Sequence, residues 1–144
     1  MLLEQIVPAL QLSIGPVIVI SGAGLVLLSM TNRYARVIDR ARSLAEALRQ
    51  ISGGKNQRIQ SQIQIISRRA RNLRLAIVFV STSLLLADVL VISLFLIALF
   101  DLHAVGLIMG LFILCMGALS IGLIIFILDV NDSMSALKIE IDGE

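Results

Sequence analysis

The chain has 144 residues, of which 58% are hydrophobic and 15% are charged, and its formal net charge is +2. A soluble domain of this size carries about a quarter charged residues, and a single soluble core cannot bury this much apolar surface. The composition therefore excludes a soluble enzyme, a disordered chain and a disulfide-rich secreted domain, and it predicts an integral membrane protein.

The positive charge is concentrated in one segment. Residues 33–74 hold eleven of the twelve Lys and Arg residues and two of the ten acids, a net charge of +9, whereas the rest of the chain carries −7. A basic block of this kind can bind nucleic acid. Next to apolar spans it more commonly sets membrane topology or contacts anionic lipid, so we expect a lipid partner and no nucleic acid.

The first apolar segment, residues 6–31, is long enough to cross the ~30 Å hydrocarbon core of a bilayer as a helix. The residues before it lack the basic region of a signal peptide, so we expect the span to remain as an anchor. Within it, Gly15-Pro16 predicts a kink with a freed carbonyl group.

A stripe of small or polar residues at heptad spacing runs along one face of this segment. Small residues let helix backbones approach closely, so one interpretation is a packing face. The other interpretation is an aqueous path in an oligomer, with the two polar members nearest the N-terminus at its outer mouth. The stripe includes Glu4, Gln11, Gly15, Gly22 and Ser29.

Residues 32–74 are expected to form a cytoplasmic, antiparallel helical hairpin between the first and second spans. Apolar residues recur at three- and four-residue steps on both sides of a turn signal at residues 52–56, as in two packed amphipathic helices. The second arm shares its apolar seam with the following span, so that helix should continue into the membrane. Because basic loops stay in the cytoplasm, the N-terminus is predicted outside and the C-terminus inside.

Eight arginines flank the membrane ends of this hairpin and should form a cationic collar at the depth of the lipid headgroups. Topological anchoring explains such a collar by itself. Guanidinium groups also match phosphate oxygens, which favours specific binding of an anionic lipid or another phosphate ligand. Asp39 is spaced to pair with several of these arginines and is expected to organise them. The collar consists of Arg33, Arg36, Arg40, Arg42, Arg68, Arg69, Arg71 and Arg74.

The second apolar segment, residues 75–100, carries Asp88 near its middle. A carboxylate at this depth costs about 2.5–3.5 kcal/mol on insertion scales, and the three spans contain no Lys, Arg or His to neutralise it. Ser81 shares its face one heptad earlier, and the depth predicts contacts with residues 15–22 and 115–120. One interpretation is a cation or proton site. The other is a protonated Asp88 that holds helices together through a hydrogen bond.

The third apolar segment, residues 104–128, follows a predicted tight outer turn at residues 101–103. Its single cysteine, Cys115, is expected to be a buried and unreactive thiol. Ser120 is its one clearly polar side chain, which predicts that this helix lies outermost against lipid. Residues 129–144 form an acidic tail that returns to the cytoplasm, where we expect it to be solvated rather than folded back on the arginines.

The segment after the first span contains a run with a distinctive pattern, Asn32-Arg33-x-x-Arg36-x-x-Asp39-Arg40-x-Arg42-x-Leu44. Because this run follows one apolar span and precedes two more, the chain resembles a bacterial domain-of-unknown-function family of small three-span inner-membrane proteins with an Arg-rich segment after the first helix. The resemblance covers nearly the whole chain. It implies a bacterial inner-membrane location, and it brings no established activity.

Together these features predict an all-α homo-oligomer that forms an ion- or proton-conducting path, because one three-helix protomer is too small to enclose a pore. Asp88 would be the midplane site, and the collar would lie at the cytoplasmic side. The alternative is a non-enzymatic scaffold or accessory subunit whose basic helical stalk binds a protein partner or anionic lipid. The sequence contains no recognisable catalytic, metal-binding or nucleotide-binding motif, so neither an enzymatic activity nor a cofactor is predicted.

Overall fold

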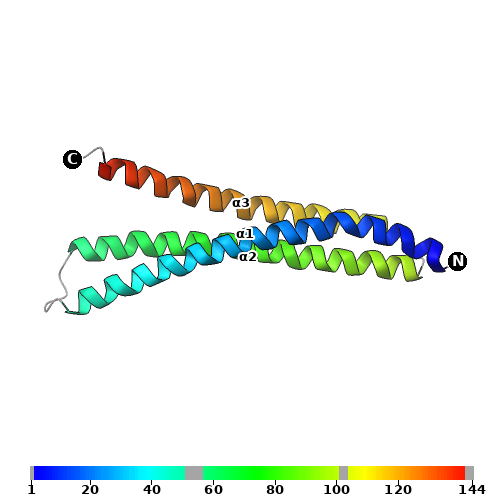
Figure 1. The fold of residues 1–144 in the computed structure, drawn as a ribbon, viewed down its shortest axis with the longest axis horizontal. Coiled ribbons are helices and arrows are strands. Elements are labelled where there is room, and N and C mark those ends of the chain that lie inside the picture. Colours follow the sequence, from blue (N-terminus) through cyan, green and yellow to red (C-terminus); the bar gives the residue numbers. More distant parts are fainter. Residues whose placement is uncertain (1, 51–56, 101–103, 142–144) are drawn as a thin grey trace.

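The computed structural model of the chain is all-α. It describes residues 2–50, 57–100 and 104–141, with side chains over residues 6–49, 61–100 and 104–131. These residues form three helices, α1 (Leu2–Gln50), α2 (Gln57–Phe100) and α3 (Val105–Ile141). Figure 1 shows a long, narrow bundle with the two termini at opposite ends. Both predicted turns, at residues 52–56 and 101–103, lie outside the described residues.

Each of the three helices is long and apolar enough to cross a membrane. Their lengths of 49, 44 and 37 residues all exceed the ~20 residues that a bilayer requires. A helix satisfies every backbone N–H and C=O within its own segment, which is the condition that an apolar surrounding imposes. By helix length and composition, the chain is a multi-pass membrane protein.

The predicted boundaries between spans and hairpin are not breaks in the structure. α2 passes through residue 74 without interruption, as its shared apolar seam predicts, and α1 passes through residue 31 in the same way. The hairpin arms are therefore the ends of α1 and α2 rather than separate helices, because i to i−4 hydrogen bonding continues whether the side chains face lipid or water. The predicted acidic tail likewise begins as helix, since α3 continues to Ile141.

α1 also remains helical through Pro8 and Pro16. Pro16 lacks the N–H that would bond to the carbonyl of Leu12, which weakens the hydrogen-bond ladder there. Nearby, Ser13 Oγ donates a hydrogen bond to the carbonyl oxygen of Ala9 at 2.7 Å. Figure 1 shows α1 as one continuous, gently bowed rod, so the helix does not break at Gly15-Pro16.

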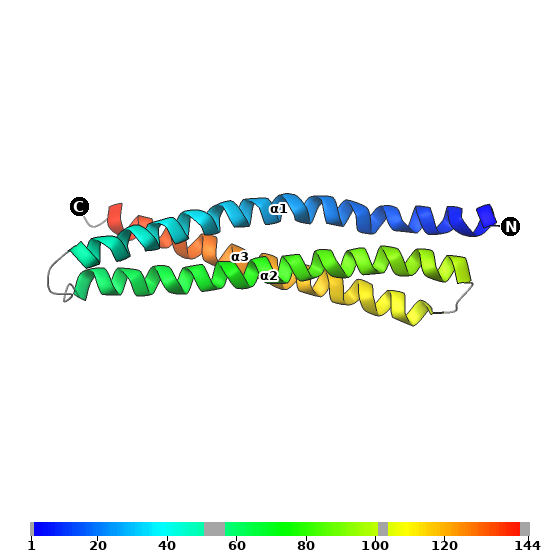
Figure 2. The same ribbon diagram turned by 90° about the horizontal axis from the view of Figure 1, so that it is seen from below.

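α2 is the central helix of the bundle. It packs against α1 on one side and against α3 on the other, whereas α1 and α3 contact each other only weakly. Figures 1 and 2 show α2 running antiparallel to both neighbours. α3 is peripheral to α2, as its lack of polar side chains predicts, and α1, which was expected to face inward, is peripheral as well.

The core of the bundle is narrow and centres on Ala23 and Met30 of α1 and on Ala76 and Val80 of α2. α3 packs against this core at Gly122. An added Cβ atom at Gly122 would lie 2.8 Å from Val80 Cγ2 and 3.1 Å from the carbonyl oxygen of Ala76. Such distances are shorter than van der Waals contact. The glycine therefore allows α2 and α3 to approach closely, as small residues do in membrane bundles.

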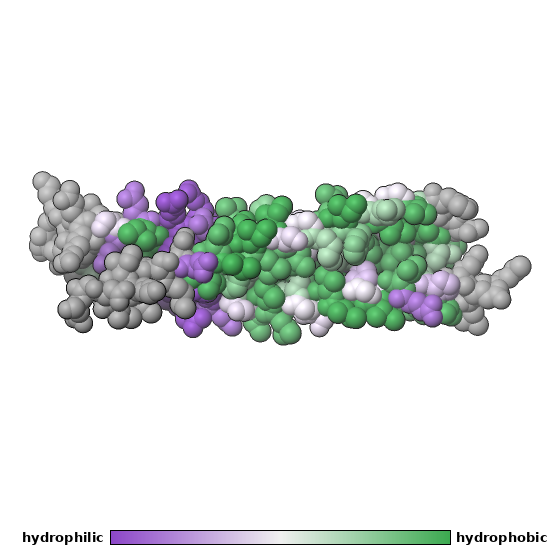
Figure 3. Space-filling view, turned by 90° about the horizontal axis from the view of Figure 1, so that it is seen from above, coloured by the Kyte–Doolittle hydropathy of each residue, from purple (hydrophilic) through white to green (hydrophobic). Residues whose placement is uncertain are grey.

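The outer surface separates into an apolar part and a charged part. Figure 3 shows hydrophobic surface over the middle of the bundle and hydrophilic residues gathered toward the end where α1 finishes and α2 begins. Large apolar side chains such as Leu25 and Ile113 are 70% and 65% exposed. This distribution suits a bundle surrounded by lipid along its middle, with its charged end among headgroups.

Candidate functional site

The basic end of the bundle contains a buried acid, Asp129 of α3. Its side chain is 2% exposed, and its Oδ1 atom lies 3.9 Å from Nε of Arg69 on α2. A buried carboxylate requires a nearby cation to offset its lost hydration, which explains why the partly exposed Arg69 lies against it. The prediction of a solvated tail from residue 129 is therefore wrong for Asp129, which belongs to the interior of the bundle.

Arg33 brings α1 to the same level as this ion pair. Its Cζ atom lies 5.8 Å from the centroid of the Phe126 ring, one turn before Asp129 on α3, which is a cation–π distance. The three helices thus each place one charged residue here. We call Arg33, Arg69, Asp129 and Phe126 the three-helix cluster.

The other arginines of the predicted collar are on the exposed surface. Asp39 is also exposed, and it forms no ion pair with any side chain that the structure describes. α1 turns the partly buried Val37 and Ala41 toward the bundle, which leaves Asp39 outside. The organising role expected of Asp39 therefore stays a prediction, and Asp129 is the acid that engages Arg69 in the described part of the chain. The exposed members are Arg36, Arg40, Arg42, Arg68, Arg71 and Arg74.

A groove with a volume of about 510 Å³ runs along the part of α2 that precedes its apolar run. Figure 1 shows the last turns of α3 diverging from α2 in this region. The groove presents two guanidinium groups, an amide and a hydroxyl, all of which can donate hydrogen bonds to an anion. We call it the α2 groove; the described residues that line it are Gln64, Ile65, Ser67, Arg68 and Arg71.

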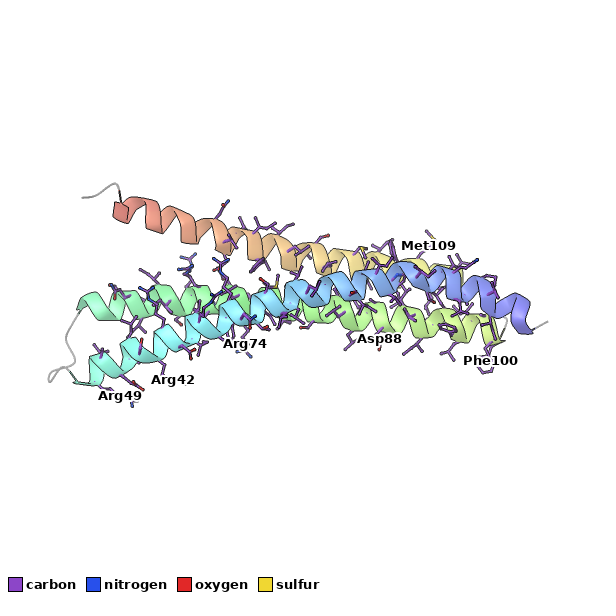
Figure 4. All side chains as sticks on the ribbon, viewed as in Figure 1. Arg42, Arg49, Arg74, Asp88, Phe100 and Met109 are labelled. Carbon is purple, nitrogen blue, oxygen red and sulfur yellow. The ribbon has the colours of Figure 1, made fainter. Side chains whose placement is uncertain are left out.

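Asp88 and Ser81 are both exposed side chains on α2. Figure 4 shows Asp88 projecting from α2 on the side away from α3. The predicted contacts of Asp88 with residues 15–22 and 115–120 are therefore wrong, because the rotation of α2 turns this face outward. Among the described residues, no group of three His, Cys, Asp or Glu side chains is placed to hold a metal ion.

The polar pair inside the bundle consists of Ser83 on α2 and Cys115 on α3. Ser83 Oγ donates a hydrogen bond to the Cys115 carbonyl oxygen at 2.9 Å, and Cys115 Sγ donates to the Ser83 carbonyl oxygen at 3.3 Å. Both side chains are buried, at 0% and 2% exposure. The thiol is buried, as its sequence context predicts, and it also links the two helices by a reciprocal hydrogen bond.

The small and polar stripe of α1 faces away from the rest of the chain. Gln11, Gly15, Gly22 and Ser29 are all exposed, and an added Cβ atom at either glycine would meet nothing within 4 Å. Packing of these residues against α2 or α3 is therefore excluded, so the stripe faces lipid or another polypeptide. The side chain of Glu4 lies outside the described part of the chain.

Sequence reasoning missed the roles of Ser83 and Asp129. A usable signal existed for both, because Arg69 and Ser83 are 14 residues apart on α2, and Cys115 and Asp129 are 14 residues apart on α3. An antiparallel register that places Ser83 opposite Cys115 therefore also places Arg69 opposite Asp129. Gly122 belongs to the small-residue spacing Ala118-xxx-Gly122, which is typical of packed membrane helices. Gly106 and Gly110 have the same four-residue spacing but open space around them, so the spacing alone does not identify the glycine that packs.

No curated protein and no solved structure is significantly similar to the chain. A family model described as protein of unknown function (DUF2721) matches residues 13–139. The matched region includes most of the first span, the Arg-rich segment, the other two spans and the three-helix cluster, and it confirms the resemblance to a domain-of-unknown-function family of small three-span membrane proteins. The chain belongs to this family of proteins of unknown function, DUF2721.

Proposed function

We propose that this protein is a homo-oligomer of the bacterial inner membrane whose subunits meet across the exposed face of Asp88 and form an ion- or proton-conducting path there. The observation that carries the proposal is the exposure of Asp88 in the middle of a membrane-spanning stretch of α2. In this arrangement the N-terminus lies outside and the basic end lies in the cytoplasm, because Arg-rich segments next to spans remain inside.

An Asp88 side chain in contact with lipid is energetically unfavourable. A carboxylate at the bilayer centre costs about 2.5–3.5 kcal/mol on insertion scales, and no described side chain of the chain forms an ion pair or hydrogen bond with it. A second copy apposed at this face would replace lipid with protein, water or a cation. Because symmetry about the membrane normal keeps copies at one depth, their Asp88 carboxylates would lie at the same level and attract a cation or share a proton.

Between the helices of one protomer, the described side chains are closely packed. Met30, Leu73 and Val80 fill its interior with no exposed surface, and Gly122 brings α3 against α2. A conducting path must therefore run between subunits. Ser81, two turns before Asp88 on the same exposed face, would supply a hydroxyl group along that path.

Flux through liposomes that contain the purified full-length protein tests the proposal. We expect cation or proton flux for the wild type and loss of most of this flux for Asp88→Asn, which keeps the side-chain shape and removes its charge. Glu46→Gln is the matched control, because Glu46 is an exposed acid on α1 outside the apolar run. Flux at background level in both wild type and Asp88→Asn would contradict the proposal.

A second candidate function is a non-enzymatic scaffold or accessory subunit. It is favoured by the extension of α1 and α2 beyond their apolar runs, with exposed arginines on both helices. A basic stalk of this kind suits an acidic protein surface or an anionic membrane, and a simple channel does not require it. A photo-crosslinking residue at the exposed Ala35 or Ala47 should then capture a distinct protein partner in native membranes, whereas self-contacts alone would contradict this function.

A further inference from the structure

We propose that the α2 groove is a binding site for a phosphate group, with Arg68 and Arg71 contacting the phosphate oxygens and Gln64 and Ser67 completing the contacts. The inference goes beyond the conduction proposed for Asp88 and does not depend on it. It assigns a ligand class to the basic end and selects two of the eight predicted collar arginines as the binding pair.

The four polar side chains lie on adjacent turns of α2. Gln64, Arg68 and Arg71 follow one another at steps of four and three residues, which places them along one helix face, and Ser67 lies beside them. All four are exposed and line the same groove. Its volume of about 510 Å³ falls within the range of roughly 300–1,000 Å³ for small-molecule sites. The α2 groove therefore has room for a phosphate and the group that carries it.

The two arginines of the groove are available to a ligand. Neither forms an ion pair with an acid in the part of the chain that the structure describes, in contrast to Arg69, which pairs with Asp129. A guanidinium group binds phosphate through two parallel N–H bonds, which gives geometric as well as electrostatic selectivity. Two such groups match the charge of a phosphate monoester, about −1.5 to −2 near neutral pH.

The position of the groove along α2 narrows the class of ligand. Arg71 precedes the start of the apolar run at Leu75 by four residues, about 6 Å along the helix axis. This distance places Arg71, at the end of the groove nearest the apolar run, at headgroup depth, and the rest of the groove extends away from the hydrocarbon. Ile65, which is 61% exposed, adds an apolar contact to the lining. The ligand that fits is a phosphate ester, carried by a lipid headgroup or by a soluble molecule at the membrane surface.

The three-helix cluster determines which residues of α2 face the groove. Arg69 lies between Arg68 and Arg71 in the sequence, but its guanidinium approaches Asp129 of α3. Successive residues of an α-helix are rotated by about 100°. An Arg69 that is held inward therefore leaves Arg68 and Arg71 on the outer side, where both are exposed.

Native mass spectrometry of the full-length protein in detergent tests the site. The probes are phosphatidic acid, which carries a phosphate monoester, and phosphatidylcholine, which has no net headgroup charge. We expect phosphatidic acid to bind at least about tenfold more tightly, and we expect Arg68→Gln or Arg71→Gln to weaken its binding about tenfold. The matched control is Arg49→Gln, which removes an exposed arginine of α1 outside the groove and should change the affinity less than about twofold.

Two results would overturn the site. Equal losses of affinity in Arg68→Gln and Arg49→Gln would indicate diffuse attraction to the net charge of the segment. Equal binding of phosphatidic acid and phosphatidylcholine would show that the phosphate monoester is not recognised. Circular dichroism confirms that each variant keeps its helical content, and Arg71→Lys provides a milder change that retains the charge and loses the bidentate contact, with a smaller expected loss of affinity.

Competition with glycerol 3-phosphate and inorganic phosphate distinguishes the two sources of the ligand. Displacement of phosphatidic acid by these soluble probes indicates a soluble phosphate ester, whereas no displacement indicates a lipid headgroup. Either result supports the site when binding is lost in Arg68→Gln. The binding assay requires no flux, so failure of this site and failure of the conduction proposed for Asp88 are observed separately.

Discussion

Arg69 on α2 forms an ion pair with Asp129 on α3, with 3.9 Å between Nε and Oδ1. The pair lies 14 residues along each helix from Ser83 and Cys115, which hydrogen-bond to each other in the core. Fourteen residues of α-helix span about 21 Å. Two polar contacts at the ends of this interval, with the close approach of Gly122 between them, therefore set one antiparallel register for α2 and α3.

Removing the charge of Asp129 should destabilise the bundle. Asp129→Asn leaves Arg69 beside a neutral amide at a position only partly open to water. Breaking a fully buried pair costs about 3–5 kcal/mol, and because the Arg69 side chain is 34% exposed we expect roughly 1–3 kcal/mol here. Thermal unfolding in detergent measures the change. The control variant Glu46→Gln should have the melting temperature of the wild type. Equal melting temperatures for Asp129→Asn and Glu46→Gln would contradict the structural role of Asp129.

Adding a methyl group at Gly122 should separate α2 from α3. In Gly122→Ala the new Cβ would lie 2.8 Å from Val80 Cγ2 and 3.1 Å from the Ala76 carbonyl oxygen, so the helices must move apart. Overpacking of this kind costs about 1–3 kcal/mol. The control is Gly110→Ala on the same helix, where the added atom meets nothing within 4 Å. The expected result is a lowered melting temperature for Gly122→Ala alone, and no difference between the two variants would refute the close approach.

Loss of the Ser83 hydroxyl should weaken the contact between α2 and α3. Ser83→Ala removes the donor to the Cys115 carbonyl oxygen, and interhelical hydrogen bonds in membrane proteins contribute about 0.6 kcal/mol on average and up to about 1.7. Ser93→Ala is the control, because Ser93 Oγ donates at 2.7 Å to Val89 within its own helix. Denaturant titration of both variants should show a loss of stability for Ser83→Ala and little change for Ser93→Ala.

Subunits that meet across Asp88 should bring their Ser81 side chains within reach of a short thiol crosslinker. We expect Ser81→Cys, in a Cys115→Ala background, to give covalent dimers in native membranes. Ile113→Cys in the same background is the control, since Ile113 is 65% exposed on α3 and lies on a different helix. Dimer yields that do not differ between the two cysteines would argue against a subunit contact at this face.

Composition and length are sufficient to predict three membrane helices and a basic end. A long apolar run in lipid must be helical, because its backbone N–H and C=O groups have no other partners. Moving an arginine into the hydrocarbon costs free energy, so the arginines lie outside the spans. The same reasoning predicts one charged end, and Figure 3 shows hydrophilic surface gathered toward one end of the bundle. It also predicts that the second hairpin arm continues as helix into the second span, which α2 confirms. α1 runs through residue 31 in the same way, because a helix does not end where its surroundings change from lipid to water.

Only the packing of the helices against one another determines how each helix is rotated about its own axis. In water an apolar stripe identifies the inward face of a helix, but lipid is as apolar as a protein core, so most of α3 and the span of α2 carry no such signal. Contacts at Gly122, between Ser83 and Cys115, and between Arg69 and Asp129 therefore decide which polar groups point inward. These contacts bury Asp129 and leave Asp88 on the outer surface. Hydrophobicity along the chain does not distinguish the two residues, because their burial depends on which atoms of neighbouring helices meet.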